Sequence, residues 1–176
     1  MVKIYKFFSY ALFFFVMLIV FLPKENLYFA LEKELKKENI IIYNETIEEG
    51  LFSLDLDESI INFQKIDIAK VDSINFNIYG LYNSLEATNI RLFTFSKNFL
   101  PSKISSLKLQ YSVLDPLVIT IYSKGDFGVL DGRYDFIKKL LQIKVIPSKK
   151  MLKEYKNTLR FLKKSQNGEY IYEQTL

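Results

Sequence analysis

The hydrophobic pattern changes at Ile40 to a period of two residues, and this alternation constrains the fold more than any other feature of the chain. Apolar and polar residues alternate in several short runs, which is typical of strands with one buried and one solvated face. Three such runs are Phe52–Asp57, Lys65–Ala69 and Ile74–Tyr79. The sequence therefore predicts a mainly β fold, built as a single antiparallel sheet with flanking amphipathic helices.

Turn signals separate the strands in the second half of the chain. Asp115-Pro116, Lys124-Gly125-Asp126 and Asp131-Gly132 each lie between apolar runs, and Asp131-Gly132 is the strongest short hairpin signal. Strands joined by tight turns pair with their neighbours, so we expect an antiparallel meander. Residues 98–105, which include Pro101, are expected to form a loop.

An uncharged apolar run, Phe7–Leu22, follows Lys3 and Lys6 and ends at Pro23. As a helix it spans roughly 24 Å, somewhat less than the hydrocarbon core of a bilayer. No small-x-small cleavage site follows the run, which favours an uncleaved signal anchor over a cleaved signal peptide or a buried soluble helix. Lysines on the short N-terminal side favour a cytoplasmic tip. We expect residues 1–22 to be the tip and transmembrane anchor of a single-pass inner-membrane protein, with most of the chain in the periplasm of a Gram-negative source.

Two amphipathic helices are expected to flank the alternating region. The first, residues 23–39, connects the anchor to the sheet, and it either lies along the membrane or covers one end of the sheet. The second, about residues 149–165, follows Pro147, and Ser148 is its N-cap. Residues 40–176, which include this second helix, are the expected periplasmic β domain.

The second helix is strongly basic, with Glu154 as the one acid among seven cations. Such a face is solvated, contacts anionic lipid headgroups or binds an acidic protein, and these interpretations stay open. Binding of nucleic acid is not expected outside the cytoplasm. The basic residues are Lys149, Lys150, Lys153, Lys156, Arg160, Lys163 and Lys164.

The chain has no histidine and no cysteine. It therefore lacks the commonest general base near neutral pH, the commonest metal ligand and any disulfide. The carboxylates of Asp55 and Asp57 stand two residues apart on the wet face of a predicted strand, without the spacing of a calcium loop. We expect a protein that is not an enzyme and binds no cofactor or metal.

The order of these parts resembles the periplasmic proteins of the type II secretion system protein N family and, through them, the AsmA-like group. The resemblance rests on the run Phe7–Leu22, the glycine-punctuated segment Gly125–Phe136, and Pro147–Tyr172, which ends in Gly168-Glu169-Tyr170-Ile171-Tyr172. It implies a curved β-sheet or groove anchored to the inner membrane, a role in an envelope assembly or in lipid transfer, and no active site. The protein C type of lipopolysaccharide transport, with one N-terminal helix and a twisted periplasmic β-groove, offers a second comparison.

Two functions remain open. In the first, an inner-membrane-anchored structural component of an envelope assembly such as type II secretion docks its partners through sheet edges and the basic helix. In the second, the concave sheet face handles lipid or lipopolysaccharide. A lipid groove needs an open apolar face with a cavity of at least a few hundred Å³, whereas a docking protein needs a filled core and an exposed patch or edge strand. The residues expected to line either the groove or an ordinary closed core are Leu107, Leu109, Tyr111, Ile119, Ile121, Ile143 and Val145.

Overall fold

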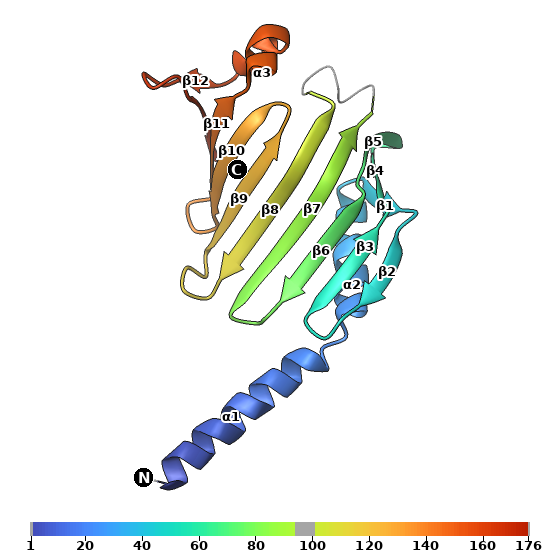
Figure 1. Cartoon of the computed structure of the whole chain (residues 1–176), viewed down its shortest axis with the longest axis vertical. Helices are drawn as coiled ribbons and strands as arrows, with labels where there is room; N and C mark the ends of the chain where they lie inside the picture. The colour runs from blue at the N-terminus through green and yellow to red at the C-terminus, as the bar shows by residue number, and fades with distance from the viewer. Residues whose placement is uncertain (1, 94–100, 176) are drawn as a thin grey trace.

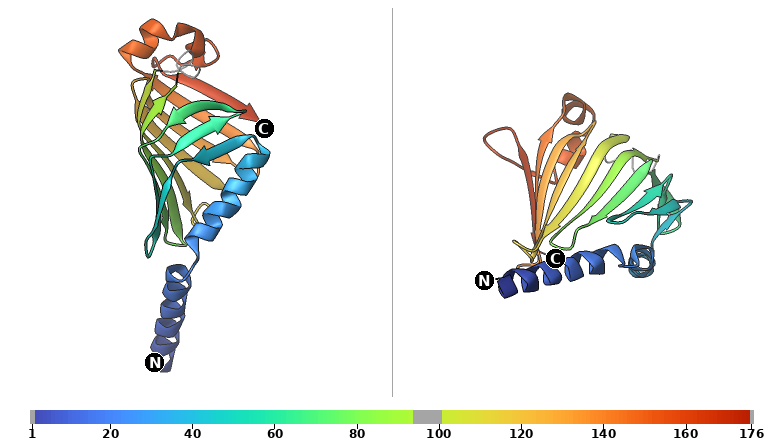
Figure 2. Two further views of the ribbon diagram at one scale, coloured as in Figure 1. Left: turned by 90° about the vertical axis from the view of Figure 1, so that its right-hand side faces the viewer. Right: turned by 60° about the horizontal axis from the view of Figure 1, so that its bottom comes forward.

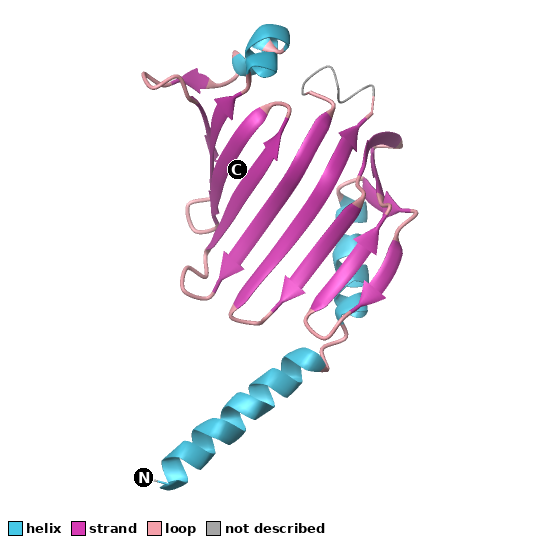
Figure 3. Ribbon diagram, viewed as in Figure 1, coloured by secondary structure: helices cyan, strands magenta, loops and turns pink. Residues whose placement is uncertain are grey.

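The computed structural model describes residues 2–93 and 101–175, and within them the protein is mainly β, with 49% of its residues in strands (Figures 1 and 3). The strands form one large antiparallel, open sheet, and two helices precede it. The helices at the N-terminal end are α1 (Val2–Val20) and α2 (Lys24–Lys37). The strands are β1 (Ile40–Tyr43), β2 (Thr46–Glu49), β3 (Ser53–Asp57), β4 (Ile60–Phe63), β5 (Ile66–Lys70), β6 (Ser73–Ile78), β7 (Tyr82–Leu92), β8 (Lys103–Ser112), β9 (Val118–Gly125), β10 (Gly128–Asp135), β11 (Leu140–Pro147), β12 (Lys163–Lys164) and β13 (Tyr170–Thr175).

The sheet forks at β7, because this strand is long enough to pair with two neighbours on the same side. Residues 83–88 of β7 pair with β6, which continues the sheet through β3 to β2. Arg91 and Leu92 pair instead with β5, which leads through β4 to β1. On its other side β7 pairs with β8, and the order then runs β9, β10, β11, β13 and β12.

The sheet curls, so that α2 and the last strand lie on the same side of it (Figure 2). The strand register places apolar residues opposite one another on this concave face. In one such row, Leu54 pairs with Phe76, which pairs with Leu85. The same row continues through Leu109 to Ile121. The residues between them point to the convex face and are mostly polar, as the alternation predicts.

Helix α2 closes the concave face over the forked half of the sheet. Tyr28 is 2% exposed and packs its ring against Phe76, with the ring centroids 6.2 Å apart. The expected helix over residues 23–39 is therefore α2, and of its two expected positions it takes the one over the sheet. Around Tyr28 lies a buried cluster of Leu54, Leu56, Ala69, Val71, Ile74, Ala87 and Ile90. We call this cluster together with Tyr28 the closed core.

The hairpin predicted at Asp131-Gly132 is wrong. Both residues lie in the middle of β10, where Gly132 pairs with Ile121 on one side and Ile143 on the other. The turns lie instead at residues 126–127 and 136–139. The glycine here is favoured by limited space rather than by turn geometry, because an added Cβ would lie 3.3 Å from both the Cβ of Ile121 and the carbonyl of Gln142.

The single helix predicted for residues 149–165 is also wrong. Helix α3 (Lys149–Glu154) ends at Tyr155, whose φ of −120° and ψ of 35° are not helical, and α4 (Lys156–Leu159) follows. Residues 163–164 then form β12, which pairs with β13. The break turns two different helical faces inward, so that Met151 and Leu159 both pack on Phe127. The predicted N-cap is confirmed, since the Ser148 hydroxyl accepts a 3.1 Å hydrogen bond from the Met151 amide.

The loop predicted for residues 98–105 is partly replaced by strand, because β8 begins at Lys103. Residues 98–100 of that prediction lie outside the described part of the chain.

Within the described residues, α1 and α2 reach the length and hydropathy of a membrane span only as a pair, bent by 57° at their break, and no helix does so by itself.

Candidate functional site

The second half of the sheet leaves an apolar concave face that α2 does not cover. We call the concave face of β8, β9, β10, β11 and β13 the trough. Every residue predicted to line a groove or core lies on it: the register pairs Leu109 with Ile121 and Tyr111 with Ile119. Further along, Gly132 separates Ile121 from Ile143 in the same row. Of the seven predicted residues Val145 is buried, and the other six are half-buried.

The upper part of the trough holds a cavity of about 380 Å³ beneath α3 and α4. Its wall contains no charged residue among those that the structure describes, and its polar side chains are Ser123, Thr158 and Tyr172. The Ser123 hydroxyl is already satisfied, since it donates a 2.9 Å hydrogen bond to the carbonyl of Ser106. The full lining is Ile104, Leu107, Ile121, Ser123, Phe127, Leu130, Ile143, Val145, Met151, Thr158, Leu162 and Tyr172. Such a surface can bind apolar groups by exclusion of water, but it offers little to a polar ligand.

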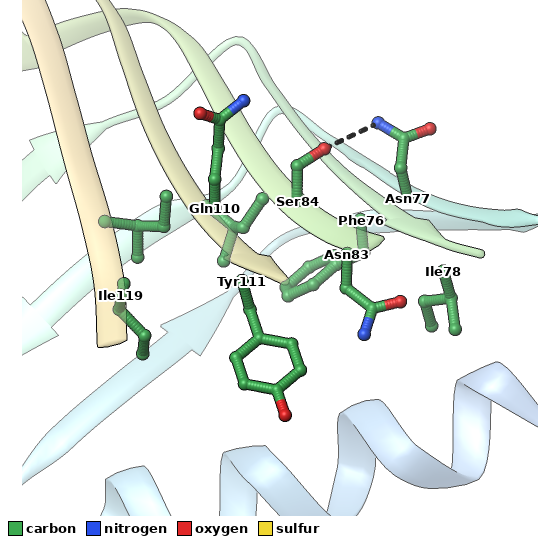
Figure 4. Close-up of a pocket in the computed structure, with 10 residues that line it drawn as sticks. Phe76, Asn77, Ile78, Asn83, Ser84, Gln110, Tyr111 and Ile119 are labelled. Carbon is green, nitrogen blue, oxygen red and sulfur yellow. Dashed lines mark hydrogen bonds between the residues drawn. The ribbon is translucent and has the colours of Figure 1, made fainter. Parts of the chain in front are cut away.

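A second, lower cavity of about 190 Å³ lies nearer to α1, where the trough borders β6 and β7, and these two strands supply six of its ten lining residues. Figure 4 shows that Tyr111 and Ile78 point to the concave side, whereas Gln110 and Ser84 point to the opposite side of the sheet. Leu109 and Ile119 also line this cavity. The predicted groove residues thus divide between two cavities on one face, three around the lower one and four around the upper one.

Several lining residues escape the sequence analysis. Met151 and Leu162 come from the segment that was expected to be one continuous helix, so their inward direction depends on the break at Tyr155. Tyr172 is different, because it pairs directly with Ile143 in β11. Its alternation with Glu169 and Glu173 is a signal that could have placed it on the apolar face.

The predicted basic face is not a single helical face, although all seven residues are exposed. Lys163 and Lys164 lie on β12, and Lys149 and Lys153 lie on α3. Lys150 donates a 3.1 Å hydrogen bond to the carboxylate of Asp126, and this bond raises the pKa of the Lys150 amine.

Two of the seven basic residues line a separate cleft beside the upper cavity. Lys156 and Arg160 share this cleft of about 370 Å³ with Leu152, Leu159 and Tyr170. Neither cation forms an ion pair within the part of the chain that the structure describes. Tyr170 and Tyr172 are two residues apart on β13, so the cleft and the upper cavity share the same strand.

Two carboxylates near the start of the sheet form hydrogen bonds with side chains of α2. The Tyr28 hydroxyl donates a 2.9 Å hydrogen bond to Glu45. Burial, and then this bond, raises the pKa of the Tyr28 phenol above its usual range. Lys24 is 1% exposed, and its ammonium donates to the carbonyl of Leu22 at 3.2 Å and to Glu49 at 3.5 Å. These bonds fix α2 and the end of α1 to the sheet, and they leave the trough open on its other side.

A comparison of the chain with protein-family models, with curated proteins and with solved structures finds no match.

Proposed function

We propose that this protein is a membrane-anchored, non-catalytic lipid-handling protein that holds acyl chains in the trough. The observation that carries the proposal is the upper cavity: about 380 Å³ of space walled by aliphatic and aromatic side chains, on a sheet face that remains open. This volume lies within the range of small-molecule sites, which begins at about 300 Å³. Each methylene group transferred from water to such a surface contributes about 0.8 kcal/mol.

The apolar face of the trough is open to water, and this is a reason to expect a ligand that covers it. An apolar surface of this kind on a protein in water marks a binding site or an aggregation risk. Helix α2 adds apolar surface beside β3 and β6, where Leu27 and Leu31 stay exposed while Tyr28 is buried. Acyl chains suit the site, since they are apolar along their length and flexible enough to follow a curved sheet.

The cleft beside the upper cavity suits the other end of the same ligand. Lys156 and Arg160 lie there without an acidic partner among the described residues, next to the hydroxyl-bearing strand β13. A phosphate or carboxylate headgroup would offer these cations charge-assisted hydrogen bonds while the chains lie in the cavity. We therefore propose an anionic lipid as the ligand class, with lipopolysaccharide as one member of that class.

The docking function, in an envelope assembly such as type II secretion, is the second candidate. It would use sheet edges and the basic residues of α3, α4 and β12. The two end strands of the main path are short, since β1 has four residues and β12 has two, and β12 leaves residues 172–175 of β13 as an edge in the described structure. Short edge strands offer few backbone groups for strand addition. The resemblance to protein N and to the AsmA-like group is compatible with both functions, and the open apolar face favours lipid handling. Both proposals keep the expected inner-membrane anchor and periplasmic location.

The test is native mass spectrometry of the full chain, extracted from membranes in a mild detergent. We expect co-purifying phospholipid or lipopolysaccharide, and we expect Ile121→Asp to reduce its occupancy at least tenfold. Ile121 lines the upper cavity, so the new carboxylate would have to be desolvated beside an acyl chain.

A matched control comes from the neighbouring residue on the same strand. Thr120 is exposed on the convex face, so Thr120→Asp adds the same charge without touching the trough. Lipid that only surrounds α1 would be retained equally by both variants, and that result would refute the proposal. Circular dichroism of both variants confirms that the sheet is intact.

A further inference from the structure

Four turns at one end of the sheet expose large apolar side chains. The strands β2–β3, β6–β7, β8–β9 and β10–β11 are joined at this end, which is the end nearest to α1 in Figure 1. Leu114 is 93% exposed, Ile137 73% and Leu51 66%. We call these tips the apolar rim; its members are Leu51, Tyr79, Leu81, Val113, Leu114, Leu117, Phe136 and Ile137.

The hairpin turns described at the opposite end of the sheet have fewer exposed apolar residues at their tips. In the turn between β9 and β10, Phe127 is buried, and Lys124 near the end of β9 is exposed. The hairpin between β4 and β5, at the same end, exposes Phe63 (38%) and Ile66 (48%), but the polar Gln64 and Lys65 form its tip. One residue beyond α4, Phe161, is exposed at that end and stands apart from these turns. Turns normally carry polar residues, so four turns with exposed apolar tips at one end of the sheet suggest a partner.

The apolar rim is continuous with α1. Gly80 in the turn between β6 and β7 has a φ of +80°, and a Cβ added to it would lie 2.9 Å from Ile19 and 3.0 Å from Phe15. The end of α1 therefore packs directly on one of the four tips, and Ile19 is 5% exposed. The rest of α1 exposes apolar side chains around its circumference, among them Phe7, Phe8 and Phe14. A single apolar surface thus runs from the helix across the end of the sheet.

Charge next to the rim fits the surface of a bilayer. Lys138 and Lys139 are exposed in the same turn as Ile137, and the Lys138 ammonium lies 3.8 Å from the carboxylate of Asp135. The acid at the neighbouring tip, Asp115, is held by Arg133 at 3.0 Å. Apolar tips that enter the acyl boundary, with lysines at headgroup level, are the arrangement by which proteins rest on anionic membranes.

We propose that the apolar rim docks on the lipid bilayer and holds the lower mouth of the trough at the membrane surface. The occupant is a membrane rather than a protein, because the exposed apolar side chains lie as separate points on four turns. These side chains are also continuous with α1, the proposed membrane anchor. A fluid acyl boundary accommodates such points without shape complementarity. This inference goes beyond the proposed function, since the body can dock in this way whether or not the trough carries lipid.

The chain has no cysteine, so a single introduced cysteine can be labelled without background. The full-length variants Leu114→Cys and Ile137→Cys would carry an environment-sensitive fluorophore and would be reconstituted into vesicles of phosphatidylcholine and phosphatidylglycerol. A second set of vesicles carries a quencher on the acyl chains. Asn167→Cys, exposed in the loop before β13 at the other end of the sheet, is the matched control.

We expect at least threefold quenching and a blue-shifted emission for both rim positions, and neither effect for the control position. Equal quenching at the rim and at the control would overturn the proposal. Protection of the rim probes that depends on protein concentration and not on vesicles would also overturn it, in favour of contact between copies. The labelled side chains do not line the trough, so lipid occupancy measured on the same samples tests the two proposals separately.

Discussion

The two halves of the sheet have the same alternation of apolar and polar residues, but their concave faces are buried to different degrees. In the half around the fork, the concave residues Leu54 and Leu56 are at most 2% exposed beneath Tyr28. In the other half, the equivalent positions Leu107 and Ile121 are half-buried and line a cavity. The difference lies in the cover: α2 has 14 residues, whereas α3 and α4 have six and four. An apolar strand face therefore indicates burial only once the element that covers it is known.

The largest difference between the two halves is expected in the loss of stability caused by two truncations to alanine, one in each half. Leu56 and Leu107 lie in the same cross-strand row, on opposite sides of Ile74 and Ala87. Leu56→Ala should lower the free energy of unfolding by about 2–5 kcal/mol, because it leaves a cavity in the closed core. Leu107→Ala should cost roughly 1 kcal/mol, because that side chain is already partly exposed.

Denaturant unfolding of both variants in the same detergent measures the comparison, with circular dichroism as the readout. Equal losses of stability would mean that the trough is packed as tightly as the closed core. The distinction between the two halves would then be lost.

A second test uses the hydrogen bond that joins α2 to the sheet. At pH 8, Tyr28→Phe should destabilise the protein by about 1–3 kcal/mol, because it leaves the half-buried Glu45 without its donor. The pKa of Tyr28 is raised by folding from its ordinary value of 10.0, so the folded state keeps a proton that the unfolded chain loses. The stabilising effect is therefore complete below pH 10 and declines as the pH rises above 10.

Unfolding at pH 8 and pH 11 should show this decline as a narrower gap between the wild-type protein and the variant. We expect the gap to shrink by about 1 kcal/mol at pH 11. The other tyrosines titrate in both proteins and cancel in the difference. A gap that stays constant between the two pH values would contradict the role assigned to Tyr28.

Much of the trough could be predicted from sequence, because a period of two places side chains on a face without any knowledge of tertiary structure. Leu109 and Ile121 were found in this way, from alternation alone. The fork at β7 could not be found, because it depends on which distant strands share that strand. The break at Tyr155 has the same origin: local propensity favours one helix, and packing on Phe127 overrides it.

Asp131-Gly132 shows why the strongest local signal failed. An Asp-Gly pair favours a tight turn, but it also fits wherever a side chain would collide with its neighbours. Here the glycine lies between Ile121 and Ile143 on the floor of the trough. Choosing between the two roles requires the identity of the cross-strand neighbours, which a short sequence window does not contain.

The third test fills the upper cavity with a larger side chain. Ile143→Phe should enlarge a side chain that lines this cavity and reduce acyl-chain binding about tenfold, because the ring displaces a few methylene groups of the ligand. The measurement is retention of lipid by native mass spectrometry. Thr120→Phe, on the convex face, is the control and should retain lipid normally; equal retention by the two variants would mean that the chains do not reach Ile143.

The smallest expected effect concerns the charge beside the open half. Replacing both Lys156 and Arg160 by Gln should reduce the preference for phosphatidylglycerol over phosphatidylcholine about threefold to tenfold, since exposed cations act through a screened field. The paired control replaces Lys149 and Lys153 by Gln, which removes the same charge from α3 outside the cleft. In 0.5 M salt the effect of the cleft variant should nearly vanish.

If the control lowers the preference as much, the cations act only through net charge, and the headgroup does not lie in the cleft. If only the cleft variant does so, the ligand has its chains under α4 and its headgroup beside Tyr170, and the open half of the sheet is a site with a defined polarity.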